Sequence, residues 1–128
     1  MQCPARVLIV EDDNAMAQMC AKLIRRRGHS AVIAGSSQDA LAIVRAGTGV
    51  DVVLSDVQMP NMTGVELMAG LRAIDGDLPI ILMTGYANVL SPTEAVELGA
   101  TDYLTKPFDS ETLLCSLERA IRTVRRLA

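Results

Sequence analysis

The feature that most constrains this chain is an alternation of short apolar runs with amphipathic stretches of helix length, repeated five times along 128 residues. Continuous β-branched runs of this length are typical of strands that are buried on both faces of a sheet. The predicted strands are Ala5–Val10, Ala31–Ala34, Asp51–Ser55, Pro79–Met83 and Thr101–Leu104. The predicted helices are Asn14–Arg27, Ser37–Ala46, Val65–Ile74, one from the N-cap Ser91 to near Gly99, and one from the N-cap Asp109 to about Leu127.

Five strands that each lead into a helix predict one α/β domain over residues 1–128. Right-handed crossovers between parallel strands place helices on both faces of the sheet, so we expect a doubly wound sandwich with five helices. We adopt the strand order 2-1-3-4-5, which is common among doubly wound folds but does not follow from these residues alone. A chain of this length buries enough surface to fold without disulfides or a structural metal.

The scarce residue types exclude several classes of protein and site. The longest apolar runs are far below the ~20 residues that cross a bilayer, and no leader pattern opens the chain, so we expect a cytoplasmic protein without membrane contact. Cys3, Cys20 and Cys115 are odd in number and lack a CxxC motif, which favours reduced packing residues. His29 is the only histidine, which excludes a multi-histidine metal site, and we expect it in a surface turn.

The charge balance argues against nucleic acid as a direct partner. Fifteen acidic residues against twelve basic ones give a net charge of −3, and only three residues are aromatic. Arg119, Arg122 and Arg126 share one face of the last predicted helix. Solvation of this face, where cations complement the helix dipole, is the favoured interpretation, and a docking role is the alternative.

Polar and charged residues gather where the predicted strands end. Glu11 and Asp12 follow the first strand, Asp56 the third, Thr84 the fourth and Lys106 the fifth. In a doubly wound sheet the carboxyl ends of the strands meet at one edge, where ligands bind. We therefore expect these five residues around one cavity.

Three carboxylates in one cavity repel one another and raise each other's pKa unless a cation neutralises them. Oxygen ligands with room for several waters suit Mg²⁺, and Mn²⁺ is the alternative ion. Lys106 then offers a positive charge, and Thr84 a hydroxyl donor, to the oxygens of a transferring phosphoryl group. Asp56 remains as a nucleophile that would form an acyl phosphate.

Four segments at the strand ends carry a resemblance to a known family: VLIVEDD (7–13), LSDVQMPNMTG (54–64), ILMTGY (81–86) and GATDYLTKPF (99–108). Together they closely resemble the receiver domain of two-component response regulators, whose fold is flavodoxin-like. The resemblance implies that Asp12 and Asp56 bind magnesium directly, that Glu11 acts mostly through water, and that the main-chain carbonyl of Gln58 completes the ligands. Asp13 is then left as a helix cap, and Glu11 stands where Asp is commoner in the family.

The resemblance also implies a function and partners. Asp56 would receive a phosphoryl group from a phosphohistidine on a sensor histidine kinase or phosphotransfer protein. Phosphorylation would change the face made by the helix after Ser91, the strand Thr101–Leu104 and the last helix, where an output domain, a partner or a second copy would dock. The domain would catalyse its own phosphorylation and dephosphorylation but turn over no metabolite.

Secondary roles in the family fall on further positions of this chain. Thr84 and Tyr103 would form the switch, and Gly85 would keep access to the phosphoryl group open. Gln58 and Tyr86 would tune phosphate loss. Structural roles fall on the loop residues Pro60 and Gly64 and on Pro107, which in the family follows a cis peptide bond.

Two alternatives of other classes remain open. The first is a receiver-like interaction module that is not phosphorylated, although all the residues expected of an active domain are present. The second is a flavodoxin-like electron carrier, which Glu11, Asp12 and Asp13 disfavour because they would repel a flavin phosphate.

Overall fold

The computed structural model describes residues 4–57, 64–85, 92–106 and 108–127 of the chain. Its five strands are β1 (Arg6–Val10), β2 (Ser30–Ala34), β3 (Val52–Asp56), β4 (Ile80–Thr84) and β5 (Asp102–Thr105). Its five helices are α1 (Asn14–Arg26), α2 (Ser37–Arg45), α3 (Gly64–Ile74), α4 (Pro92–Glu97) and α5 (Ser110–Leu127). Each strand is followed by a helix, as the alternation of apolar and amphipathic stretches predicts.

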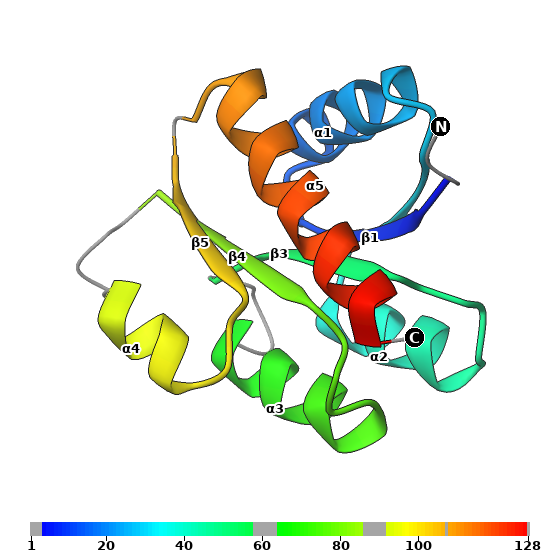
Figure 1. Cartoon of the computed structure of the whole chain (residues 1–128), viewed down its shortest axis with the longest axis vertical. Coiled ribbons are helices and arrows are strands. Elements are labelled where there is room, and N and C mark those ends of the chain that lie inside the picture. Colours follow the sequence, from blue (N-terminus) through cyan, green and yellow to red (C-terminus); the bar gives the residue numbers. More distant parts are fainter. Residues whose placement is uncertain (1–3, 58–63, 86–91, 107, 128) are drawn as a thin grey trace.

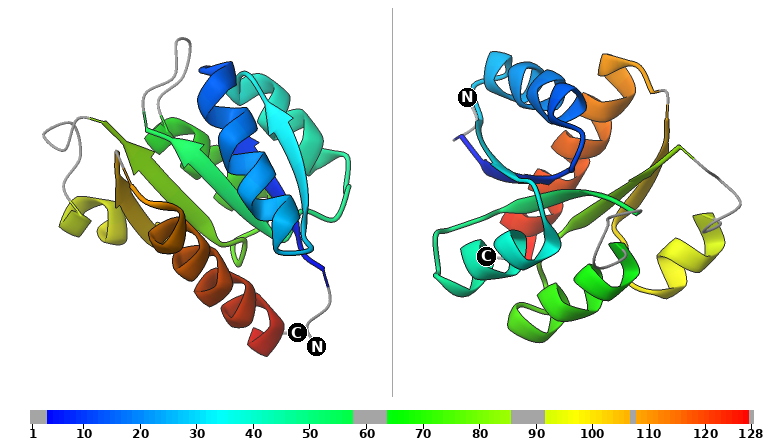
Figure 2. Two further views of the ribbon diagram at one scale, coloured as in Figure 1. Left: turned by 90° about the horizontal axis from the view of Figure 1, so that it is seen from above. Right: turned by 180° about the vertical axis from the view of Figure 1, so that it is seen from behind.

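The strands form one parallel sheet in the order β2-β1-β3-β4-β5. This confirms the doubly wound, flavodoxin-like class and the strand order that we adopted. Helices α1 and α5 cover one face of the sheet, and α2, α3 and α4 cover the other (Figure 1). Figure 2 shows the same two layers from above and from behind.

Alternate residues of each strand fill two separate cores. On β1, Val7 and Ile9 belong to the core shared with α1 and α5, whereas Leu8 and Val10 belong to the core shared with α2, α3 and α4. Both sets are fully buried, which is why the strand sequence shows no polar alternation. Burial on both faces fixes the register of the sheet, because a one-residue slip would exchange the contents of the two cores.

Side-chain caps set the beginnings of three helices. The carboxylate of Asp13 accepts hydrogen bonds from the amides of Ala15 and Met16, which confirms the expected cap of α1. The carboxylate of Asp109 accepts a bond of 2.7 Å from the amide of Thr112, as expected for α5. Ser36 caps α2 through the amide of Asp39. The expected cap Ser91 lies outside the described residues.

Two expectations about single residues were wrong. His29 is buried rather than exposed in a turn: its Nδ1 accepts from the amide of Ala5 at 2.9 Å, and its Nε2 lies 3.1 Å from Glu118 on α5. Cys115 is exposed, whereas Cys20 is buried in the core as expected and Cys3 lies outside the described residues. Among the helices that the structure describes, none is both long and apolar enough to cross a membrane.

Candidate functional site

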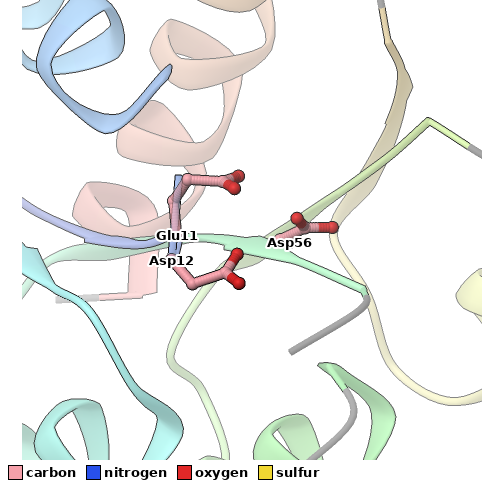
Figure 3. Close-up of side chains that lie close together, drawn as sticks. All are labelled: Glu11, Asp12 and Asp56. Atoms are coloured by element: carbon pink, nitrogen blue, oxygen red, sulfur yellow. The ribbon is translucent and has the colours of Figure 1, made fainter. Parts of the chain in front are cut away.

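The ends of β1 and β3 bring three carboxylates together at one edge of the sheet. Glu11 and Asp12 follow the last residue of β1, and Asp56 is the last residue of β3, which pairs directly with β1. Carboxylate oxygens of all three lie within 4.8 Å of one another (Figure 3). The expected ends of β3 and β4 are each one residue early, so that Asp56 and Thr84 belong to the strands and are held by the sheet.

Lys106 directly follows β5, and its side chain reaches the carboxylates at the same edge of the sheet. Its Nζ donates to Oε2 of Glu11 at 2.9 Å and to Oδ2 of Asp56 at 3.2 Å. The amide of Lys106 also donates to the carbonyl of Thr84 at 2.6 Å, which ties the β5 end to β4. The sequence predicts the approach to Asp56, but not that the lysine also pairs with Glu11.

Glu11 and Asp12 differ sharply in their surroundings although they are adjacent in the chain. Glu11 is only 2% exposed, and its second carboxylate oxygen accepts a weak bond of 3.3 Å from the amide of Asp13. Asp12 is exposed. Glu11 is therefore fixed by Lys106 and the backbone, while Asp12 is accessible to a ligand from solvent.

The electrostatics of the site show an excess of negative charge. Burial raises the pKa of Glu11, the hydrogen bond with Lys106 opposes that rise, and the charge of Asp56 adds to it. Partial burial acts to lower the pKa of Lys106, but Glu11 and Asp56 outweigh it, so the net shift is upward. One lysine against three carboxylates leaves a net deficit of positive charge, and all-oxygen donors of this kind suit a hard divalent cation.

The switch residues lie next to this cluster. Thr84 is fully buried, and Tyr103 on β5 is partly buried against the core beneath α4. Burial raises the pKa of the Tyr103 phenol, while a side-chain hydrogen bond with Thr84 lowers it and the charge of Glu94 raises it. The two residues that the sequence analysis assigned to a switch are thus in direct contact.

The remaining predicted positions are only partly described. Gly85 follows β4, is exposed, and has open space where a Cβ would stand. Gly64 is the first residue of α3. Gln58, Pro60, Tyr86 and Pro107 lie outside the described residues, so their expected roles stay predictions.

Comparison with known proteins decides the family. The model of the family described as "Response regulator receiver domain" matches residues 7–118, which is most of the chain. The chain belongs to the response regulator receiver domain family. This removes the support for a flavodoxin-like electron carrier.

Individual relatives agree with this assignment. The transcriptional regulatory protein ZraR of Salmonella typhimurium is 37% identical over 93% of this chain, which spans 27% of that relative. Chemotaxis response regulator CheY4 of Vibrio cholerae is 35% identical, covers 92% of this chain and 99% of its own, and has a TM-score of 0.81. A CheY-like receiver domain protein of Methanospirillum hungatei is 25% identical, with a TM-score of 0.90 over 98% of this chain and 100% of its own. The chain thus spans about a quarter of the first curated relatives' length.

Proposed function

We propose that this receiver domain is a phosphorylation switch in which Asp56 accepts a phosphoryl group from a phosphohistidine of a sensor histidine kinase or phosphotransfer protein. The observation that carries the proposal is the contact of the Asp56 carboxylate with Lys106 inside a cluster of three carboxylates. The cluster fits the family's acidic pocket for Mg²⁺. Beyond its own phosphorylation and dephosphorylation, we assign the domain no activity.

The transfer exchanges one bond for another. A carboxylate oxygen of Asp56 attacks phosphorus, the new O–P bond gives an acyl phosphate, and the N–P bond of the phosphohistidine breaks with its electron pair returning to the imidazole nitrogen. Lys106 stays within reach of Asp56 and stabilises charge on the phosphoryl oxygens, and the Thr84 hydroxyl offers a further donor. Burial of Asp56 at the strand end restricts water at the nucleophile.

Asp12, Asp56 and the main-chain carbonyl of Gln58 would hold the metal, with Glu11 acting through water. The accessible carboxylate of Asp12 supports a direct contact, and the engagement of Glu11 by Lys106 supports an indirect one. When bound, Mg²⁺, or Mn²⁺ in its place, neutralises the excess negative charge and polarises the phosphoryl group.

The output face of the switch would be α4, β5 and α5. The contact between Thr84 and Tyr103 supports this choice because it joins the end of β4 to the strand beneath α4. Val96 on α4 is 64% exposed, and Leu98, the first residue after α4, is 46% exposed. Apolar side chains are therefore available on this face to an output domain, a partner or a second copy.

Labelling with a small phosphodonor tests the proposal. Incubation with acetyl phosphate and MgCl₂ should add one phosphoryl group to the wild-type chain in an intact-mass spectrum, and Asp56→Asn should accept none. Full labelling of Asp56→Asn, or equal labelling in excess chelator, would contradict the assignment. No labelling of the wild type would favour the alternative of an interaction module that is not phosphorylated.

A further inference from the structure

A groove lies between the turn that follows α1 and the side of α5. We call it the arginine groove; it has a volume of about 960 Å³ and is lined by Arg27 and His29 from the turn and by Leu114, Glu118 and Arg122 from α5, among others. Helices α1 and α5 lie on the same face of the sheet (Figure 1). The residues that line the groove on α5 therefore belong to the same helical layer as α1.

The groove has a buried floor and charged walls. His29 and Leu114 are buried, whereas Arg27 and Arg122 are exposed. The amide of Ala5 can only donate, so Nδ1 of His29 carries no proton and Nε2 donates to Glu118. The one acidic side chain of the described lining is therefore already engaged.

The cations of the walls are available to a ligand. Within the part of the chain that the structure describes, no acidic side chain lies within ion-pairing distance of Arg27 or Arg122. Arg119, which also lines the groove, pairs with Asp102 on β5 but stays two-thirds exposed. The groove thus combines a buried floor of His29 and Leu114 with the exposed guanidinium groups of Arg27 and Arg122, for which the described residues supply no ion-pair partner.

The surface of α1 carries further positively charged side chains. The helix contains no acidic residue, and Lys22, Arg25 and Arg26 line a second hollow of about 500 Å³ on its surface. These cations stand out because the whole chain has a net charge of −3. The three carboxylates of the acidic cluster thus lie at the carboxyl ends of the strands, whereas these cations lie toward the C-terminal ends of α1 and α5.

We propose that the arginine groove binds an acidic polypeptide segment of a partner protein, with apolar side chains on the floor and carboxylates against Arg27 and Arg122. Charge complementarity selects the occupant, because arginine pairs with carboxylates in bidentate geometry. Nucleic acid is disfavoured, because none of the described residues that line the groove is aromatic and so none can stack on a base. The proposal is independent of phosphorylation at Asp56.

Fluorescence anisotropy with a labelled ten-residue peptide of eight glutamates and two leucines tests the proposal at low salt. Arg27→Glu and Arg122→Glu should each weaken binding by about two- to fivefold or more, the range of one exposed ion pair. Arg45→Glu is the matched control, since Arg45 is exposed in the last turn of α2 and its replacement changes the net charge by the same amount. Peptide binding by this control should equal that of the wild type.

Each of the following outcomes would overturn the proposal. Equal weakening in all three variants would show an effect of net charge alone, and no binding by the wild type at low salt would remove the site. Tighter binding of duplex DNA or of phosphatidylglycerol vesicles, or a salt-sensitive self-association lost in Arg122→Glu, would assign the groove to another occupant. Circular dichroism and acetyl phosphate labelling of each variant verify the fold and separate this test from that of Asp56.

Discussion

At the scale of single residues, the adjacent carboxylates Glu11 and Asp12 of the acidic cluster have different surroundings and therefore different expected roles. Glu11 is buried against Lys106, while Asp12 is exposed at the same strand end. A buried carboxylate that already has a cationic partner gains less from a metal ion than an accessible one, because its charge is partly neutralised. The metal should therefore depend on Asp12 more than on Glu11.

The first prediction compares these two residues by metal titration. Asp12→Ala should lower the affinity for Mg²⁺ more than Glu11→Ala does, because only Asp12 is expected to contact the ion directly. Thermal unfolding with and without MgCl₂ gives a second readout, because a bound ion stabilises only the folded state. Equal affinities for the two variants would contradict the ranking.

The second residue-scale prediction concerns thiol reactivity and its pH dependence. Burial raises the pKa of Cys20 to about 11, with the charge of Glu11 adding to the rise and that of Lys106 opposing it. The reactive thiolate of Cys20 is therefore almost absent at pH 8 in the folded protein, whereas Cys115 is exposed to reagent.

In a Cys3→Ser background, iodoacetamide at pH 8 should modify Cys115 of the native protein and leave Cys20 unmodified in peptide mass spectra. In urea both thiols should react, because unfolding removes the burial that raises the pKa of Cys20. Modification of Cys20 in the native protein at the rate seen for Cys115 would contradict its burial.

At the scale of elements, the sequence predicts the strands and helices well because each carries its own periodicity and caps. All ten elements occur, and Asp13 and Asp109 cap their helices as expected. Strand ends differ by a residue because pairing with neighbours sets them. Val57, for example, donates to the carbonyl of Met83, which carries β3 pairing past Ser55.

The site could be assembled from sequence only as far as strand ends allow. The topology places Asp56, Lys106 and Glu11 at one edge of the sheet. Which carboxylate the Lys106 side chain contacts depends on its conformation, and Glu11 is 95 positions away in the sequence, so no local pattern predicts the pair. His29 was misplaced for the same reason, since its partner Glu118 is 89 positions away. The exposure of Cys115 did have a signal, because the helical spacing of Leu113, Leu117 and Ile121 leaves it off the buried face.

His29 gives an element-scale prediction because it connects the start of β1 to α5. His29→Phe keeps a ring of similar size but leaves the buried amide of Ala5 without an acceptor. The free energy of unfolding should fall by about 1–3 kcal/mol in urea titrations, the cost of a buried polar group without a partner. Ser30→Ala is the control, since Ser30 is exposed and its hydroxyl makes only a long bond of 3.5 Å, and should change stability little. Equal stability of the two variants would contradict the role of His29.

At the scale of the whole molecule, the phosphorylation site and the proposed output face share two strands. Asp56 pairs with Met83 on β4, and the next residue along, Thr84, pairs with Thr105 on β5. Tyr103 reaches back to the Thr84 hydroxyl from β5. A phosphoryl group on Asp56 brings new acceptor oxygens near Thr84, so the Thr84 hydroxyl can bond either to Tyr103 or to the phosphoryl group.

Phosphorylation should therefore shift a population that already exists in the free protein, by about 1–3 kcal/mol as in typical allosteric couplings. When Thr84 turns toward the phosphoryl oxygen, Tyr103 loses its hydrogen bond and repacks beside β4, and the face of α4, β5 and α5 changes with it.

The ring signals of Tyr103 in NMR spectra should then move when beryllofluoride is added as a phosphoryl mimic. Thr84→Ala should still be phosphorylated on Asp56 but show a smaller Tyr103 response, whereas Thr105→Ala, an exposed position on β5, should respond like the wild type. An unchanged Tyr103 signal in the wild type, while resonances around Asp56 shift, would refute the coupling, because Thr84 would then bond the mimic without any effect on its neighbour.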